Sequence, residues 1–285
     1  MILVCGSTGT IGSQVIQALS KAAVPVRALA REPGQTTPRQ DQAQVQYVVG
    51  DLAKPETLKA ALDGVTEAFL LSPIGSNQYE LEANFAEAAA AAKGKRIVKL
   101  SVLGAAPDAP FEFGRIHGRV EAKIQESGLA WTFLRANMLM QNLRWYKSAL
   151  SQGALPLPLG GAAVSHIDAG DIGAVAAQVL MDNRHSMKTY ALTGPESLTG
   201  EQAAAILSSA FGKTIEYRPA SMTDFRNFLK GSESEFVVNA ECELFDLWSE
   251  GMGKNVTSCI KETTGREATT LKEFAERNRK QLLES

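Results

Sequence analysis

The sequence predicts an α/β fold, a doubly wound parallel sheet followed by a smaller and mainly helical lobe. The main observation is that short apolar runs alternate with helix-period segments through the first half of the 285 residues, which is typical of repeated strand–helix–strand units. The first run, Ile2–Cys5, contains only apolar residues, as expected of a strand covered on both faces. Beyond residue 195, helix-period segments follow one another with little strand between them.

Each element is predicted from its own pattern of apolar residues. Strands are expected where apolar and β-branched residues cluster, at residues 2–5, 24–30, 45–49, 68–71, 96–101, 130–135 and 188–193. Helices are expected where apolar residues recur every three or four positions, at residues 13–20, 56–62, 78–93, 114–126, 168–181, 200–211, 222–229, 235–251 and 271–283. We therefore expect a first domain at 1–137 that carries the parallel sheet, with this sheet completed by about 164–194. A smaller lobe is expected from 138–163 and 195–285.

A glycine turn lies between the first strand and the first helix. Gly6, Gly9 and Gly12 recur at a three-residue spacing. Gly6 permits a tight turn, Gly9 leaves no Cβ between the backbone and a bound group, and Gly12 lets the helix pack closely. With the free N–H groups and positive dipole end of the helix, this pattern predicts a cradle for a dinucleotide pyrophosphate; the alternative is an ordinary strand–helix turn. The predicted contacts are Gly6, Ser7, Thr8, Gly9, Thr10, Ile11 and Gly12.

The Gly-x-x-Gly-x-x-Gly spacing resembles that of extended and atypical short-chain dehydrogenases/reductases, which have a Rossmann fold. In this fold the end of the second strand selects the cofactor, since a carboxylate there binds the ribose 2′-OH of NAD and an arginine binds the 2′-phosphate of NADP. Arg31 comes directly after that strand, and Glu32, one position later, is expected to point away. We therefore expect NADP(H) as the cofactor, with NAD(H) less favoured; the alternative for Arg31 is a solvated loop residue.

Two later strand ends provide further candidate cofactor contacts. Asp51 and Leu52 follow the third strand, where related folds hold the adenine. Asp51 is equally well interpreted as the cap of a turn toward Pro55. Ser72 and Pro73 follow the fourth strand and are expected beside the pyrophosphate and the nicotinamide ribose, unless Pro73 merely ends the strand.

The candidate catalytic residues differ from the usual pair of short-chain dehydrogenases. Those enzymes generally use Tyr-x-x-x-Lys, and none of the five tyrosines here has a lysine four residues further on. His117 and Glu121 lie where that pair would be, four residues apart on one face of a predicted helix, and Ser101 ends the preceding strand. We expect these three residues to be catalytic. The alternative is that His117 and Glu121 form a surface helix pair worth about 0.2–0.5 kcal/mol.

Several segments together resemble the NmrA-like family of atypical short-chain dehydrogenases, and within it the quinone and triphenylmethane-dye reductases. They are the glycine turn, 26–31, 50–51, 117–121, 135–142, 165–172, 190–194 and 264–274. The resemblance covers essentially the whole chain. It implies an NADP-binding Rossmann fold, with Arg31 on the 2′-phosphate and with Asn137 and Met138 beside the nicotinamide.

The resemblance implies an enzyme that transfers hydride from NADPH to a conjugated small-molecule acceptor such as a quinone, dye or imine. Reduction of such an acceptor gives a stabilised anion or a neutral amine, so that solvent or His117 can supply the proton without an activated tyrosine. A second hypothesis is a non-catalytic NADP(H)-binding redox sensor that acts through a protein partner, as some members of the family do. The glycine turn is also compatible with a nucleotide-sugar epimerase, but the lack of a Tyr-x-x-x-Lys pair argues against that function.

The composition argues against several other classes of protein. A formal net charge of −2 and the lack of a basic run disfavour nucleic acid as a partner. No apolar segment approaches the ~20 residues that span a bilayer, and a strand starting at Ile2 leaves no room for a signal peptide. Three dispersed cysteines predict neither a disulfide framework nor a metal site. We therefore expect a cytoplasmic protein.

Overall fold

A computed structural model describes residues 1–32 and 44–284 of the chain. The chain divides into two compact units. The first unit comprises Met1–Arg135 and Ala169–Ala191, and the second comprises Ala136–Asp168 and Leu192–Ser285. The chain thus leaves the first unit near residue 135 and returns to it for one segment before it ends in the second unit.

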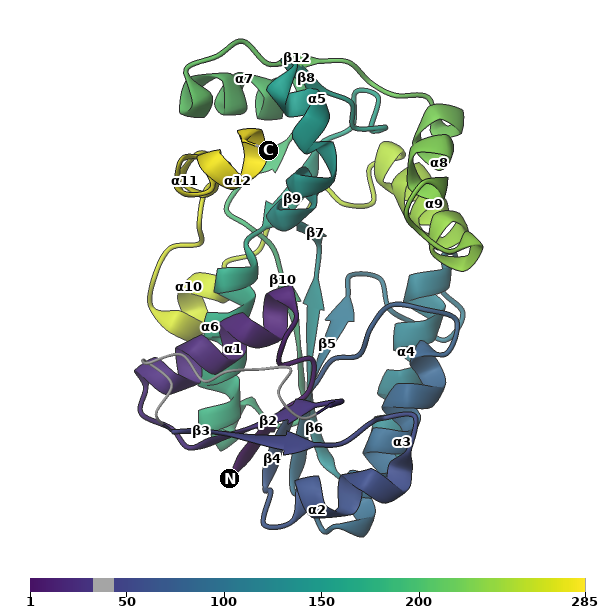
Figure 1. Cartoon of the computed structure of the whole chain (residues 1–285), viewed down its shortest axis with the longest axis vertical. Helices are drawn as coiled ribbons and strands as arrows, with labels where there is room; N and C mark the ends of the chain where they lie inside the picture. Colours follow the sequence, from purple (N-terminus) through teal and green to yellow (C-terminus); the bar gives the residue numbers. More distant parts are fainter. Residues whose placement is uncertain (33–43, 285) are drawn as a thin grey trace. The chain divides into compact units, whose positions relative to one another are not determined.

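The first unit is built on a seven-stranded sheet with the strand order β10-β6-β5-β4-β1-β2-β3 (Figure 1). Its strands are β1 (Ile2–Val4), β2 (Val26–Ala30), β3 (Val45–Val49), β4 (Glu67–Leu70), β5 (Arg96–Val102), β6 (Ala130–Ala136) and β10 (Lys188–Leu192). The pairings from β3 through β2, β1 and β4 to β5 are parallel. The strand order reverses between β1 and β4, which is the arrangement of a Rossmann sheet. The predicted fold class is therefore confirmed.

Helices lie on both faces of this sheet (Figure 1). The described helices of the first unit are α1 (Thr10–Lys21), η1 (Pro55–Thr57), α2 (Leu58–Leu62), α3 (Gln78–Ala91), α4 (Glu112–Glu126), α6 (Ala169–Met181) and η3 (Asn183–His185), where η denotes a 3₁₀ helix. Helices α1 and α6 pack against each other, and α3 packs against α4. The two pairs cover opposite faces, as the alternation of strands and helices predicts.

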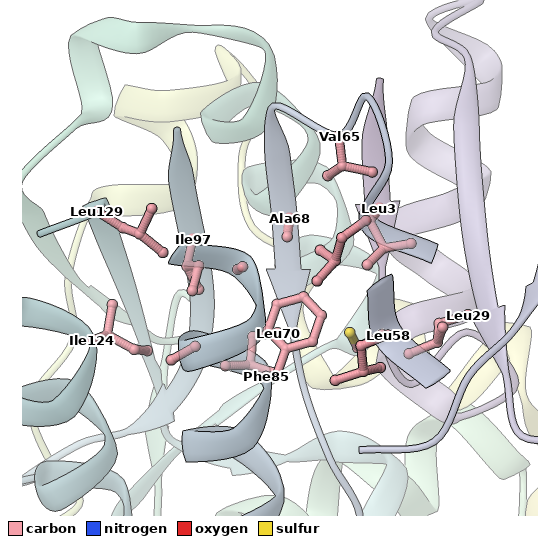
Figure 2. Close-up of a cluster of buried hydrophobic side chains, with 14 of the residues drawn as sticks. Leu3, Leu29, Leu58, Val65, Ala68, Leu70, Phe85, Ile97, Ile124 and Leu129 are labelled. Carbon is pink, nitrogen blue, oxygen red and sulfur yellow. The ribbon is translucent and has the colours of Figure 1, made fainter. Parts of the chain in front are cut away.

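The core on the α3/α4 side joins residues that are far apart in the sequence. Figure 2 shows Leu3 of β1, Leu70 of β4 and Ile97 of β5 directed toward Phe85 of α3 and Ile124 of α4. Leu3, Phe85 and Ile124 are fully buried. Burial of each such side chain contributes about 1.5–3 kcal/mol. This core holds α3 and α4 against the strands, which matters because both helices carry side chains of the candidate site.

The second unit is mainly helical and contains two small sheets. Its described elements are β7 (Met138–Leu139), η2 (Met140–Tyr146), α5 (Lys147–Ser151), β8 (Ala154–Leu155), β9 (Val164–Ile167), β11 (Ser197–Leu198), α7 (Gly200–Phe211), β12 (Glu216–Tyr217), α8 (Met222–Lys230), α9 (Glu235–Ser249), α10 (Cys259–Thr264), α11 (Leu271–Arg277) and α12 (Arg279–Leu283). Strands β11, β9 and β7 form one sheet, and β12 and β8 form the other.

Two of the predicted segments differ from the expectation in their strand pairing or their continuity. Of the segment at about 164–194, only β10 joins the seven-stranded sheet as a strand; Val164–Ile167 instead pairs with β7 and β11. The predicted helix over 271–283 is two helices separated at Asn278. The Asn278 side chain donates a hydrogen bond to the Phe274 carbonyl oxygen at 2.8 Å. An asparagine that bonds to nearby backbone in this way competes with helix continuation. None of the described helices is both long enough and apolar enough to cross a membrane.

Candidate active site

The loops that carry the predicted cofactor contacts in the first unit lie at one edge of the sheet. Strands β1 to β5 pair in parallel, so their carboxyl ends lie on the same side. Gly6, Arg31 and Gly50 follow β1, β2 and β3, and Ser72 follows β4 closely. Ser101 lies near the end of β5. In open α/β sheets, ligands bind at this edge, beside the point where the strand order reverses.

The glycine turn has the geometry that its sequence predicts. Gly6 has a φ of +64°, in the left-handed region that favours glycine. A Cβ on Gly12 would lie 2.1 Å from the Gly6 carbonyl oxygen, so only glycine allows α1 to approach the turn this closely. Gly9 is exposed at the N-cap of α1, where an added Cβ would meet only the Gly6 oxygen, at 3.4 Å. The backbone at Gly9 is thus open to a ligand.

The start of α1 has the features of an anion site. Its first turn contains no acidic residue, and no side chain caps it, so its first N–H groups lack partners within the helix. The Ser7 hydroxyl is turned inward, where it donates a hydrogen bond to the Leu29 carbonyl oxygen at 2.6 Å and ties the turn to β2. Thr8 and Thr10 are exposed, whereas Ile11 is buried. These residues fit a pyrophosphate held mainly by backbone N–H groups; the contacts themselves stay a prediction.

The other predicted cofactor contacts of the first unit have different environments. Arg31 is exposed directly after β2. The Asp51 carboxylate accepts a hydrogen bond from the Ala53 N–H at 3.0 Å, which is the turn contact expected as its alternative role. The Leu52 carbonyl oxygen accepts a hydrogen bond from the Asn84 side chain at 3.0 Å. Pro73 is exposed. Arg31 is thus an exposed cationic side chain among these predicted contacts, and no hydrogen bond or ion pair joins it to another described residue; its contact with a phosphate stays a prediction.

Ser72 leads into a buried charged network. Its N–H and its hydroxyl both donate hydrogen bonds to Glu82 Oε1, at 3.2 and 3.0 Å. The other carboxylate oxygen of Glu82 pairs with Lys99 Nζ at 2.5 Å, and both side chains are fully buried. Lys99 also donates to the Leu100 carbonyl oxygen at 2.8 Å and contacts His117 Nδ1 at 3.0 Å. The Lys99 ammonium therefore has one ion-pair partner, Glu82, and two hydrogen-bonding partners, the Leu100 carbonyl oxygen and His117 Nδ1.

This network determines the tautomer of His117. Because Lys99 donates to Nδ1, a neutral His117 imidazole carries its proton on Nε2. Nε2 lies 3.4 Å from the Gln78 side-chain nitrogen, and Gln78 Oε1 is buried without a partner among the described residues. Turning the Gln78 amide by 180° satisfies both groups, because Oε1 then accepts from Nε2–H. His117 is thus held from both ring nitrogens.

The environment of His117 disfavours its charged form. The ring is buried, and burial followed by the charge of Lys99 lowers its pKa well below the usual value. A neutral histidine is a poor general acid near pH 7. The prediction that His117 is catalytic stays untested, but these contacts favour a role as a fixed hydrogen-bonding group over a role as proton donor.

Glu121 belongs to a second network. Both His117 and Glu121 are buried, so the alternative of a surface pair is wrong, and no hydrogen bond joins the two among the described residues. Glu121 accepts a hydrogen bond from the Ser101 hydroxyl at 2.6 Å and forms a bidentate pair with Arg135, at 3.1 and 2.5 Å. These contacts connect β5, α4 and β6. The catalytic role predicted for Glu121 and Ser101 stays untested, while their observed contacts join the carboxyl-terminal parts of β5 and β6 to α4.

Asn137 and Met138 lie in the second unit. The Asn137 amide nitrogen donates to Ser165 Oγ at 2.7 Å and to the Gly253 carbonyl oxygen at 2.8 Å. Because the Gly253 carbonyl oxygen can only accept a hydrogen bond, the atom of the Asn137 amide that faces it must be the nitrogen. The amide oxygen, Oδ1, is then buried without a partner among the described residues. Met138 is buried in β7 and pairs with His166 of β9. The orphaned Oδ1 is the kind of acceptor that a carboxamide N–H of a nicotinamide needs.

Sequence analysis did not identify Glu82, Lys99 and Gln78 as site residues. A signal was present, because Lys99 interrupts the apolar run of β5 and Glu82 lies on the buried side of an alanine-rich helix. Charged residues are seldom fully buried unless they are paired. No group of three potential ligands among the described His, Cys, Asp and Glu side chains could hold a metal ion.

Comparison with known proteins extends over the whole chain. The model of the NmrA-like family matches residues 1–278. The chain is 39% identical over 277 residues to the NAD(P)H azoreductase of Xenophilus azovorans, covering 96% of both proteins. Two solved structures are 27% identical with a TM-score of 0.87 and coverage of 97% of this chain and 99% of the other: the Citrobacter sp. triphenylmethane reductase complexed with NADP(H) and an Escherichia coli NADPH-dependent quinone oxidoreductase complexed with NADPH. These matches confirm the resemblance, and the chain belongs to the NmrA-like family.

Proposed function

We propose that this protein is an NADPH-dependent oxidoreductase that transfers hydride to a conjugated small-molecule acceptor, such as a quinone or an azo dye. The observation that carries the proposal is 39% identity, over nearly the whole of both chains, to a protein named NAD(P)H azoreductase. The quinone and triphenylmethane reductases of similar structure support the same class of acceptor. The open glycine turn at the carboxyl edge of the sheet supports a dinucleotide as the source of hydride.

The cofactor assignment follows the chemistry of the residues present. When bound, NADPH supplies the hydride. The turn from Gly6 to Gly12 would hold the pyrophosphate, and Arg31 would pair with the 2′-phosphate that distinguishes NADPH from NADH. Asp51 and Leu52 are proposed beside the adenine, and Ser72 and Pro73 beside the pyrophosphate and the nicotinamide ribose.

In the second unit, Asn137 and Met138 are proposed as contacts of the nicotinamide. The unpartnered Oδ1 of Asn137 supports this assignment, because its amide nitrogen is already committed to Ser165 and Gly253. In the first unit, the Lys99–Glu82 pair holds the N–H and hydroxyl of Ser72, so the loop after β4 is fastened to α3 and β5. A loop that is already held in place is preorganised for a ligand. The entropy cost of ordering it belongs to folding and does not weaken binding.

The experiment is a measurement of NADPH oxidation by the purified full chain with a para-quinone, an azo dye and a triphenylmethane dye, with NADH as the comparison. Saturable turnover with a preference for NADPH is the expected result. Tight NADPH binding without turnover of any acceptor would instead favour the non-catalytic redox sensor, which would act through a protein partner. We propose the cytoplasm as the site of the reaction; Cys5, Cys242 and Cys259 are all free and buried, as suits a reducing compartment.

A further inference from the structure

The buried carboxylate of Glu82 is connected to the glycine turn of the first unit. Strand β4 pairs with β1, whose carboxyl end leads into the turn. The Leu71 carbonyl oxygen, directly after β4, would lie 3.2 Å from a Cβ on Gly6. Ser72 is the next residue, and both its N–H and its hydroxyl donate hydrogen bonds to Glu82 Oε1, at 3.2 and 3.0 Å. Glu82 therefore holds the segment on which Gly6 packs.

The Glu82 carboxylate places a negative charge near the predicted pyrophosphate site. Cys5 directly precedes Gly6 and is fully buried. Burial, and then the Glu82 carboxylate, raise the pKa of the Cys5 thiol. By contrast, the first turn of α1 contains no acidic residue. Like charges repel strongly in an interior of low dielectric constant, so an unbalanced carboxylate here would oppose the binding of any dinucleotide.

Lys99 balances this charge. Its ammonium lies 2.5 Å from Glu82 Oε2, and both side chains are fully buried. Oε2 has no other partner among the described residues. The other partners of Lys99 are the Leu100 carbonyl oxygen and the neutral His117 ring. The pair of Lys99 and Glu82 therefore holds the segment beside the glycine turn without adding a net charge there.

We propose that Glu82 and Lys99 are positioning residues for the dinucleotide. Glu82 holds Ser72, and with it the segment beside Gly6, in the conformation that binds the pyrophosphate. Lys99 cancels the charge that this anchor would otherwise place near the phosphates. A carboxylate is the stronger anchor, because hydrogen bonds to a charged acceptor are about twice as strong as neutral ones. The proposal rests on the proposed function, since it takes the glycine turn as the dinucleotide site.

Two single substitutions distinguish this role from a purely structural one. Lys99→Met leaves the Glu82 carboxylate unbalanced, so the affinity for NADPH and for NADH is expected to fall by about tenfold or more, because both contain the pyrophosphate. Glu82→Gln keeps a neutral acceptor for Ser72 and leaves the Lys99 ammonium in place, so neither affinity is expected to fall. A purely structural pair predicts similar losses from both substitutions, since each leaves one buried charge without its partner.

Arg96 and Glu67 provide a matched control in two of the same strands. Their ion pair, at 2.6 Å, joins the first residues of β5 and β4. These residues lie at the amino ends of the parallel strands, whereas the glycine turn lies at the carboxyl edge. Arg96→Met is therefore expected to lower the free energy of unfolding, as Lys99→Met does, and to leave the affinity for both dinucleotides unchanged.

The experiment is isothermal titration calorimetry of the full chain with NADPH and with NADH, with circular dichroism to establish that each variant is folded. The neutral double variant, Lys99→Met with Glu82→Gln, is expected to bind both dinucleotides as wild type does, and it tests the proposal even if Lys99→Met does not fold. In steady-state assays of Lys99→Met, the KM for NADPH should rise more than kcat falls.

Three results would each overturn the proposal. They are equal losses of affinity in the two single variants, a loss in Lys99→Met that is confined to NADPH, and a loss in the double variant. If wild type bound neither dinucleotide, the proposed function itself would fail.

Discussion

The buried pair of Lys99 and Glu82 makes a quantitative prediction about the first unit. Lys99→Met removes the ammonium and leaves the Glu82 carboxylate fully buried, with only the N–H and hydroxyl of Ser72 as donors. Removing one partner of a buried ion pair costs about 3–5 kcal/mol, because the other charge stays in the interior uncompensated. Met fills most of the volume of the lysine stem, so little of this loss comes from a cavity.

The double variant Lys99→Met with Glu82→Gln separates the charge from the packing. A neutral glutamine can still accept hydrogen bonds from Ser72, so most of the lost stability is expected to return. The coupling free energy in this double-mutant cycle should exceed about 1.5 kcal/mol, within the range for residues in direct contact. Urea denaturation followed by circular dichroism measures each free energy of unfolding, with Arg218→Met as an exposed control, since Arg218 pairs with Glu216 at the surface.

A loss below about 1 kcal/mol in Lys99→Met would refute this reasoning. It would mean that the Glu82 carboxylate finds water or a new partner and that the interior here is more polar than the structure indicates. Lys99→Met should also free His117 Nδ1 and raise the pKa of His117, because the lysine charge is one of its two causes of depression. Imidazole NMR resonances measure that shift, and an unchanged pKa of His117 in the variant would contradict the influence assigned to the Lys99 charge.

Three further predictions concern the cofactor and pH. Gly9→Val should abolish NADPH binding in calorimetry while the circular dichroism spectrum is kept, because its side chain would occupy the open face of the glycine turn; unchanged affinity would disprove the cradle. Arg31→Ala should weaken NADPH binding by about 1.5–3 kcal/mol, the range for a hydrogen bond to a charged group, and leave NADH binding nearly unchanged, whereas equal losses would remove Arg31 from the 2′-phosphate. The raised pKa of Glu241 means that the folded state keeps a proton that the unfolded state releases between about pH 4.5 and 7. The free energy of unfolding of the wild type is therefore expected to fall by about 3 kcal/mol as pH rises through that window. The stability advantage of Glu241→Gln over wild type should grow by that amount in urea titrations, and a difference independent of pH would contradict the assignment.

The sequence by itself determined the alternation of strands and helices, the glycine turn and the arginine after β2. These features are local, since period, glycine spacing and strand ends are encoded within a few neighbouring residues. Parallel pairing then brings the carboxyl ends of successive strands to one edge of the sheet. The approximate position of the predicted cofactor contacts in the first unit could therefore be inferred from the sequence alone. The same locality explains the predicted helices that agree closely with α3, α7 and α8.

Only the tertiary structure decided which buried polar groups are partners. Four residues of separation predicted a pair between His117 and Glu121, but His117 contacts Lys99 and Glu121 contacts Ser101 and Arg135. A helix places both side chains on its buried face, and the strands packed against it determine what each one meets. Likewise, β9 pairs outside the main sheet and Glu241 lies within an apolar face, because burial and pairing depend on residues brought together from distant parts of the chain.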